Sequence, residues 1–384
     1  MTITIGDMQG AHSLTDFIQK TVSDWLSSDE YTNMKDAKTY YFGENPVLKR
    51  NWNRITLDTG GSLSLKPKQN IYSNFFGRLV KQLVNRLLYH GIKLDDESSL
   101  LRLGANFQES TRQIAYDAAI CKVGWGFWQN GEVVPIPAEK FVPIVDDFTG
   151  SVIAGIYFWR LDENRPLIYQ LFEADGVTTW EQAKRGGKLE QTTEKTPYRY
   201  KEFKWDTGDG VRCAIADARG YGELPIVPMY ANVERRSELT VPIKTKINAY
   251  DMLNTFYADE FLQSKFVYWM ISGYSGNVDE LVAIRDTIRK LGIIAAETGQ
   301  DGKIAPQTLE PPYNAHKEIM QALEREIFRD AMLFNPEDIA GSANIATAIK
   351  AGQYPEDVKV KSFEHEVEQF VRGVMRVAGA MSTG

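Results

Sequence analysis

The feature that most constrains the fold is a continuous helical pattern over residues 238–264, which follows a proline-rich apolar segment. The segment Gly222-Glu-Leu-Pro-Ile-Val-Pro228 predicts a buried strand, and a polar turn over 231–237 joins it to the helix. The helix has apolar residues at helical spacing, namely Ile243, Ile247, Tyr250, Leu253, Tyr257 and Phe261. Because this long helix carries no catalytic motif, we interpret it as a strut that supports other parts of the chain.

A second long helix is predicted over residues 314–334, with Asn314 as its N-cap and Asn335-Pro336 as its end. Its apolar face consists of Ile319, Leu323, Ile327 and Ala331. Between the two helices, residues 266–312 predict a small α/β module, with strands at 266–271 and 291–295 and a helix at 278–291. A polar loop over 335–344 leads to a final helix, whose aligned apolar residues are Phe363, Val367, Phe370, Val374 and Val377.

The N-terminal part predicts helices followed by a β-rich region. The helices cover residues 13–42, 71–89 and 98–119, and from 125 to 230 the apolar period changes from helical to two. Strands are expected at 153–160, 167–172, 177–180, 198–205 and 211–216, with turn residues between them. The glycine–aromatic alternation Gly124-Trp-Gly126-Phe-Trp128 indicates a strand that another part of the backbone approaches closely. The fold class is therefore α+β.

Composition excludes several classes of protein. The chain has 384 residues and a net charge of −7, so it does not bind nucleic acid tightly through phosphate neutralisation. Its two cysteines, Cys121 and Cys213, exclude a disulfide framework and favour a reducing compartment. The N-terminus has no signal-peptide pattern, and the sequence has no apolar run of membrane-spanning length. We expect a protein that is soluble and cytoplasmic when it is made.

Catalytic and metal-binding motifs are absent from the sequence. Lys184-Arg-Gly-Gly-Lys188 lacks the spacing of a phosphate-binding loop, and a hairpin turn explains it better. His365-Glu366 lacks the second histidine of a zinc-protease helix, and the four histidines share no ligand spacing. Asp146-Asp147 could hold a cation, but a turn between strands accounts for it. We expect no catalytic residues, no metal and no cofactor.

The charges of the long helix oppose its dipole. Lys244 and Lys246 lie near the N-terminus of the helix, and Asp259 and Glu260 lie near its C-terminus. Each such placement costs from a few tenths to about 1 kcal/mol. We therefore expect these charges to have partners outside the helix, and we predict that the partners belong to a neighbouring copy of the chain. Charge reversal at Lys244 or Lys246 should then impair assembly.

Several short motifs, in this order, resemble the portal proteins of tailed bacteriophages that have a wing, a stem, a clip and a crown. The motifs are Tyr40-Tyr-Phe-Gly-Glu-Asn-Pro46, Asn70-Ile-Tyr-Ser-Asn74 with Leu79-Val-Lys-Gln-Leu-Val-Asn85, Tyr116-Asp-Ala-Ala-Ile120, Gly222-x-x-Pro225-Ile-Val-Pro228 and Ile247-Asn-Ala-Tyr-Asp251. Each motif is weak alone, and their order and spacing over residues 30–375 carry the resemblance.

The resemblance assigns a role to each part of the chain. It implies that residues 1–235 form the wing, with the β-rich insertion at 125–230, and that the helices 238–264 and 314–334 form the stem. Residues 266–312 would be the clip, 335–344 the tunnel loop, and 345–384 the crown. The chain stops at Met381-Ser-Thr-Gly384, where the family's crown continues, so the crown is either small or cut short.

The resemblance also implies candidate site residues. In the DNA-facing tunnel loop they are Asn335, Glu337, Asp338, Gly341, Ser342 and Asn344. In the stem and between subunits they are Lys244, Lys246, Asp251, Asp259 and Glu260. In the clip, where the terminase motor and later the adaptor would dock, they are Tyr274, Asn277, Asp279, Glu280 and Arg285. The loop 335–344 contains no lysine or arginine, so it should let DNA slide rather than hold its phosphates.

The implied function is a conduit for DNA packaging and genome ejection. Family members form closed rings, typically dodecamers, at one capsid vertex, and a head-to-tail interface that closes makes such a ring. The implied partners are other copies of the chain, double-stranded DNA without sequence specificity, the terminase large subunit, a head-completion adaptor, and the major capsid and scaffold proteins, with no membrane. The protein would be assembled in the host cytoplasm and would belong to the virion.

Two other functions stay open on the residues alone. The chain could be an enzyme that processes nucleic acid or carbohydrate through acidic residues such as Asp146, Asp147 or Asp209, or it could be a soluble scaffold unrelated to phage. A ring with a central hole favours the portal, whereas a monomer with a deep carboxylate cleft favours the enzyme.

Overall fold

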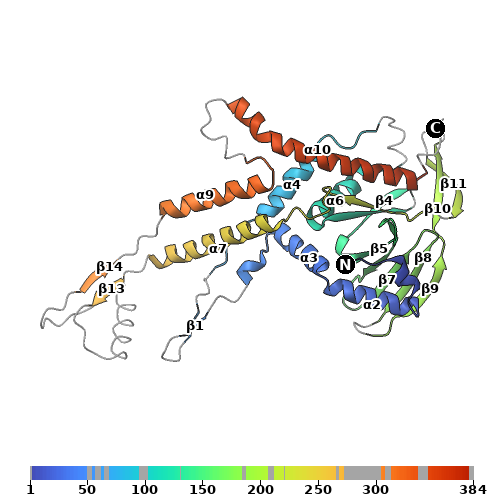
Figure 1. The fold of residues 1–384 in the computed structure, drawn as a ribbon, viewed down its shortest axis with the longest axis horizontal. Coiled ribbons are helices and arrows are strands. Elements are labelled where there is room, and N and C mark those ends of the chain that lie inside the picture. The colour runs from blue at the N-terminus through green and yellow to red at the C-terminus, as the bar shows by residue number, and fades with distance from the viewer. Residues whose placement is uncertain are drawn as a thin grey trace. The chain divides into compact units, whose positions relative to one another are not determined.

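The computed structural model describes thirteen stretches of the chain, which form two compact units (Figure 1). These stretches are residues 2–49, 54–56, 62–64, 69–94, 103–129, 131–183, 187–205, 212–219, 221–264, 268–271, 304–307, 313–335 and 345–379. The large unit comprises residues 1–50, 72–248 and 323–384, and the small unit comprises 51–71 and 249–322. Helices and antiparallel sheets are both present, so the predicted α+β class is confirmed.

The helix predicted over residues 13–42 is two helices, α2 (Leu14–Ser27) and α3 (Asp29–Tyr41), which follow the short α1 (Ile5–Gln9). The chain turns at Ser28, which has an extended backbone with ψ of 151°. The Ser28 hydroxyl accepts a hydrogen bond from the Tyr31 N–H at 3.2 Å and so caps α3. A serine followed by two acidic residues is a helix start, and this local signal divides the predicted helix in two. Gly43, with φ of 74°, then leads to a short 3-10 helix, η1 (Pro46–Lys49).

Two further helices form the core of the large unit, α4 (Phe75–Leu87) and α6 (Phe107–Cys121). The predicted apolar face of α4 is buried at Phe75, Leu79 and Leu83. Both helices begin later than predicted. The residues 98–102 of the predicted third helix lie outside the described residues.

The β-rich region forms three antiparallel sheets. The first has the order β12-β3-β4, with β3 (Val123–Gln129), β4 (Glu132–Ile136) and β12 (Ile226–Tyr230). After the 3-10 turn η2 (Ala138–Lys140), five strands follow one another in a meander: β5 (Phe141–Val145), β6 (Val152–Trp159), β7 (Leu167–Phe172), β8 (Val177–Gln182) and β9 (Glu190–Thr196). The third sheet is the hairpin β10 (Arg199–Trp205) and β11 (Arg212–Arg219). Strand β9 was not predicted, because all seven of its residues are exposed and polar.

The last helix, α10 (Ile345–Val377), packs on the three-stranded sheet and on α4 (Figure 1). Its predicted apolar residues are buried, and Phe370 lies against Gly126 of β3. A Cβ atom at Gly126 would lie 2.7 Å from the Phe370 ring, and one at Gly124 would lie 2.1 Å from the Ile114 carbonyl oxygen of α6. Both distances are shorter than real contacts allow, so the two glycines are needed for the close approach. The prediction that another part of the backbone approaches this strand closely is therefore confirmed at Gly124.

The two predicted long helices are α7 (Val241–Ser264) and α9 (Tyr313–Asp330). Helix α7 begins at Val241 rather than Glu238, because residues 237–240 hydrogen-bond to α6 and to one another. Asn314 is the second residue of α9 and not its N-cap. Helix α9 ends at Asp330, before the predicted Phe334, because Met332 adopts a left-handed backbone with φ of 54°. The Leu333 N–H then bonds to the Phe328 carbonyl at 3.0 Å, as in a Schellman ending.

The small unit contains the later part of α7, the earlier part of α9 and two short hairpins. The hairpins are β1 (Arg54–Thr56) with β2 (Ser62–Ser64), and β13 (Tyr268–Ile271) with β14 (Ile304–Gln307). The Thr255 hydroxyl of α7 accepts a hydrogen bond from the Ile71 N–H at 3.0 Å. Tyr257 of α7 and His316 of α9 stack with ring centroids 3.7 Å apart. The predicted helix 278–291 and strand 291–295 lie outside the described residues.

None of the helices within the described stretches combines the length and the apolar character needed to cross a bilayer.

Candidate functional site

The start of α7 is fixed to the end of α6. The last carbonyl groups of a helix have no partner within the helix, and here the segment before α7 supplies partners. The Ser237 hydroxyl donates to the Ile120 carbonyl at 2.6 Å, and the Glu238 N–H donates to the Ala119 carbonyl at 2.9 Å. The same hydroxyl accepts from the Leu239 N–H at 3.1 Å. The position at which the long helix begins is therefore set by hydrogen bonds to the backbone of α6.

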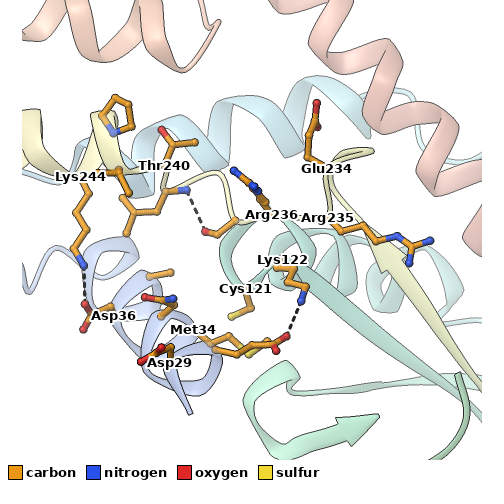
Figure 2. Close-up of a pocket in the computed structure, with 17 residues that line it drawn as sticks. Asp29, Met34, Asp36, Cys121, Lys122, Glu234, Arg235, Arg236, Thr240 and Lys244 are labelled. Atoms are coloured by element: carbon orange, nitrogen blue, oxygen red, sulfur yellow. Dashed lines mark hydrogen bonds and ion pairs between the residues drawn. The ribbon is translucent and has the colours of Figure 1, made fainter. Parts of the chain in front are cut away.

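A cavity of about 710 Å³ lies beside this junction, between α3, the end of α6 and residues 234–244 (Figure 2). Ion pairs cross its wall: the Lys244 ammonium lies 2.8 Å from the Asp36 carboxylate, and the Lys122 ammonium lies 2.6 Å from the Glu30 carboxylate. Figure 2 shows Lys244 and Asp36 pointing toward one another, whereas the Arg235 side chain points away from them. Arg235 instead lies over the Tyr230 ring at 4.5 Å. We call these two ion pairs, Lys244 with Asp36 and Lys122 with Glu30, the joint. They connect α3 to the start of α7 and to the end of α6 beside the cavity.

Helices α7 and α9 are joined within the large unit by one lysine and two carboxylates. The Lys246 ammonium lies 2.8 Å from Asp330 and 3.0 Å from Glu326. Hydrogen bonds to Asp330 and Glu326 raise the pKa of Lys246. Ile247 on α7 and Ile327 on α9 are both buried. The two helices are therefore anchored in the large unit, α7 by its start and α9 by its end.

The segment after α9 is held by α10 through a buried carboxylate. Glu356 is 2% exposed, and its carboxylate accepts from the Phe334 N–H at 3.2 Å and from the Gln82 amide of α4 at 3.3 Å. The Arg86 guanidinium lies 3.7 Å from the same carboxylate. One turn further along α10, the Lys359 ammonium donates to the Ala331 carbonyl at 2.7 Å and lies 2.5 Å from the Glu238 carboxylate.

Glu356 and Lys359 therefore form what we call the clamp: two residues of α10 that fix the end of α9 and, through Glu238, the segment before α7. The clamp therefore fixes the positions of Ala331 and Phe334, directly before residues 336–344.

A second charge cluster, which is half-buried, lies between α3, α6 and η2. The Lys38 ammonium is 2.6 Å from the Glu139 carboxylate and 3.6 Å from that of Asp117. Burial raises the pKa of Asp117 to about 6, although the charge of Lys38 opposes this. Burial lowers the pKa of Lys38, but the charges of Asp117 and Glu139 outweigh it and the net change is upward. Burial also raises the pKa of the Cys121 thiol, which disfavours its thiolate form.

The acidic residues considered for an enzyme do not form a site in the described stretches. Asp146 and Asp147 lie in the β5–β6 turn, where the Asp146 carboxylate accepts from the Phe148 and Thr149 N–H groups at 3.0 and 2.7 Å. Asp209 lies outside the described residues. Within the described part of the chain, no group of three or more histidine, cysteine or acidic residues could hold a metal ion. The interpretation of Asp146-Asp147 as a turn is confirmed.

Some predicted site residues have surroundings that differ from the prediction. Asn335 is 3% exposed, so it packs inside the large unit and does not line a surface. Asp251 of α7 is fully buried, and its role in the stem or between subunits stays a prediction. Lys244 and Lys246 have their partners within the same chain, so these partners account for the opposed helix charges without a second copy. Asp259 is half-buried on α7, and Glu260 belongs to the same helix.

The remaining predicted residues lie outside the described stretches. They are the tunnel-loop residues Glu337, Asp338, Gly341, Ser342 and Asn344, and the clip residues Tyr274, Asn277, Asp279, Glu280 and Arg285.

The residues that sequence reasoning missed are those of the joint and the clamp, chiefly Asp36, Glu356 and Lys359. Asp36 and Lys244 are separated by 208 residues, so no local pattern connects them. Pro355 lies inside α10 directly before Glu356, but nothing in this local pattern indicates that the Glu356 carboxylate is buried.

Comparison with known families gives one match that covers most of the chain. A family model described as phage portal protein, SPP1 Gp6-like, matches residues 27–383. A search of curated proteins finds no match. The matched range includes both long helices, the joint and the clamp.

Proposed function

The chain belongs to the family of SPP1 Gp6-like phage portal proteins, and on that premise we propose that it assembles head to tail into a closed ring, a dodecamer, at one vertex of the capsid. DNA would enter the head through this ring during packaging and leave through it during ejection. The family is structural rather than enzymatic, and we propose that this chain has no catalytic activity. The observation that carries the proposal is the family match over residues 27–383.

Exposed apolar side chains on the two long helices support ring assembly. The predicted apolar faces are buried only in the segments that belong to the large unit. In the segments of the small unit, large apolar residues are exposed: Leu253 and Phe261 on α7, and Tyr313 and Ile319 on α9. Apolar side chains that recur along a helix need a cover, and adjacent subunits of a ring would supply it.

The proposal also assigns a role to each part of the chain. Residues 1–235 would form the wing, α7 and α9 the stem, 266–312 the clip that docks the terminase large subunit and then the adaptor, and 335–344 the tunnel loop. Residues 345–384 would begin the crown, although α10 packs on the strands β3 and β12 of the wing. The capsid and scaffold proteins would surround the wing, and the assembled ring would become part of the virion.

Oligomeric state tests the proposal directly. The full chain should be purified and studied by native mass spectrometry and negative-stain microscopy over a range of concentrations. We expect a closed ring with a central hole and a single dominant mass. A monomer at every concentration, also in the presence of the scaffold protein, would contradict ring assembly, and a carboxylate cleft in that monomer would favour an enzyme.

A further inference from the structure

The two ends of the β5–β6 hairpin carry complementary surfaces. At the turn, Phe148 is 100% exposed between Asp147 and Thr149, and we call Asp146, Asp147 and Phe148 the knob. At the other end, a groove of about 450 Å³ is lined by α3, η2, the end of β6 and the start of β7. The two lie six residues apart along one strand, from Lys140 to Asp146, which corresponds to about 20 Å.

The knob is held in a fixed conformation. The Asp146 carboxylate accepts hydrogen bonds from the Phe148 and Thr149 N–H groups, and the Asp147 carboxylate accepts from the Gly6 N–H at 3.0 Å. The Val145 N–H also bonds to the Ile3 carbonyl at 2.9 Å. An exposed phenylalanine on a braced turn loses little conformational freedom when it binds, which favours recognition.

The groove has aromatic walls and unpaired positive charge. Its apolar lining includes Phe42, which is 70% exposed, together with Tyr31, Phe158, Trp159 and Leu167. Its two carboxylates are already paired, Glu139 with Lys38 and Glu44 with Lys49. Lys35, Lys140 and Arg160 have no carboxylate partner in the described part of the chain. The groove is thus apolar with a positive rim, and it matches an aromatic residue that follows two aspartates.

We infer that the knob of one subunit inserts into the groove of the next subunit in the ring. The inference rests on the proposed ring and names one of its interfaces. The knob and the groove are different surfaces at opposite ends of one hairpin, so a single contact between two subunits leaves one knob and one groove free for further subunits. They make a head-to-tail contact, which is the type that generates rings. The Phe148 ring fills the groove, and Asp146 and Asp147 face Lys140 and Arg160.

Removal of either surface should weaken assembly by itself. Phe148→Ala is expected to raise the concentration at which half of the subunits are in rings by at least about tenfold, because a fully exposed aromatic ring no longer becomes buried. Arg160→Glu and Lys140→Glu should have a similar effect from the other side. Tyr89→Ala, which removes another strongly exposed aromatic ring, is the matched control and should leave assembly unchanged. Thermal unfolding checks that each variant is folded.

A mixing experiment tests whether the knob and the groove meet between two subunits. Phe148→Ala subunits keep a groove, and Arg160→Glu subunits keep a knob, so an equimolar mixture should gain heterodimers with one intact junction that neither variant forms alone. In a Cys213→Ser background, Phe148→Cys with Phe42→Cys should give a ladder of cross-linked oligomers with a short bismaleimide, whereas each single variant should not.

The outcomes separate the interface from the ring itself. If the wild-type chain forms no ring, the proposed function is contradicted, and with it the inference that depends on the ring. If the wild type forms rings while Phe148→Ala assembles like Tyr89→Ala, or if the double-cysteine variant cross-links only within one subunit, the knob and groove do not form the interface and the inference is overturned.

Discussion

At the scale of single residues, Asp117 shows how the partial burial of a carboxyl group changes its pKa. Its carboxyl group on α6 has one nearby cation, Lys38, and Lys38 lies closer to Glu139, at 2.6 Å against 3.6 Å. One ammonium group therefore serves two carboxylates. Because burial disfavours the charged form more than Lys38 favours it, the pKa of Asp117 rises to about 6.

This pKa predicts how stability depends on pH. The folded chain binds a proton at Asp117 near pH 6, whereas the unfolded chain binds it near pH 3.8. Between these values Asp117 holds more protons in the folded state, so its contribution to the free energy of unfolding falls as the pH rises through this window. Asp117→Asn removes the titration, and its stability relative to wild type should increase by roughly 2–3 kcal/mol between about pH 4 and pH 7.

Chemical denaturation of both proteins across this pH range measures the difference. Asp24→Asn, at an exposed position of α2, is the control for the loss of one negative charge. A difference between Asp117→Asn and wild type that does not change with pH would show that burial does not govern this carboxyl group.

At the scale of elements, α10 contributes both core packing and the clamp. Its two neighbouring acidic residues, Glu356 and Asp357, provide a direct comparison, because both contact Arg86 but only Glu356 is buried. Removing the Glu356 carboxylate leaves the Phe334 N–H and the Gln82 amide without this acceptor, and an unsatisfied buried donor costs about 1–3 kcal/mol.

We therefore expect Glu356→Ala to lower the free energy of unfolding by about 1–3 kcal/mol, and Asp357→Ala, which removes an exposed ion pair, by less than about 1 kcal/mol. Urea denaturation of the two variants measures both values. Equal losses of stability in the two variants would mean that Glu356 acts only through its contact with Arg86 and that its burial adds nothing.

Local patterns predicted elements well where one face of the element is buried. The four-residue spacing of Phe75, Leu79 and Leu83 in α4 and the aligned residues of α10 correspond to buried faces. The break at Ser28 was missed because no glycine or proline marks it, and β9 was missed because a fully exposed strand has no alternation. The joint and the clamp depend on contacts between residues far apart in the chain, which periodicity does not report.

At the scale of the whole molecule, charge in the proposed DNA path decides whether DNA moves freely. The loop 335–344 contains acidic and neutral residues and no basic ones. A basic ring would neutralise phosphates and retain DNA, because each neutralised phosphate releases counterions. A loop without positive charge therefore suits a channel through which DNA has to slide.

Glu337→Lys with Asp338→Lys should thus leave ring assembly intact and reduce packaging. The measurement is the amount of nuclease-protected DNA in heads assembled with the variant ring. Glu190→Lys with Glu194→Lys makes the same charge change on the exposed strand β9 and is the matched control. Packaging by the loop variant at the control level would rule out a DNA-facing role for this loop.

The packing of α10 has a consequence for the synthesis of the protein. The strands β3 and β12 leave the ribosome long before Phe370 and Val374 are translated, and they cannot complete their core until the last helix is available. A nascent chain therefore exposes the apolar face of these strands until α10 has left the ribosome. Chains that terminate before α10 lack this cover, so we expect chaperones and proteases to bind their exposed apolar face.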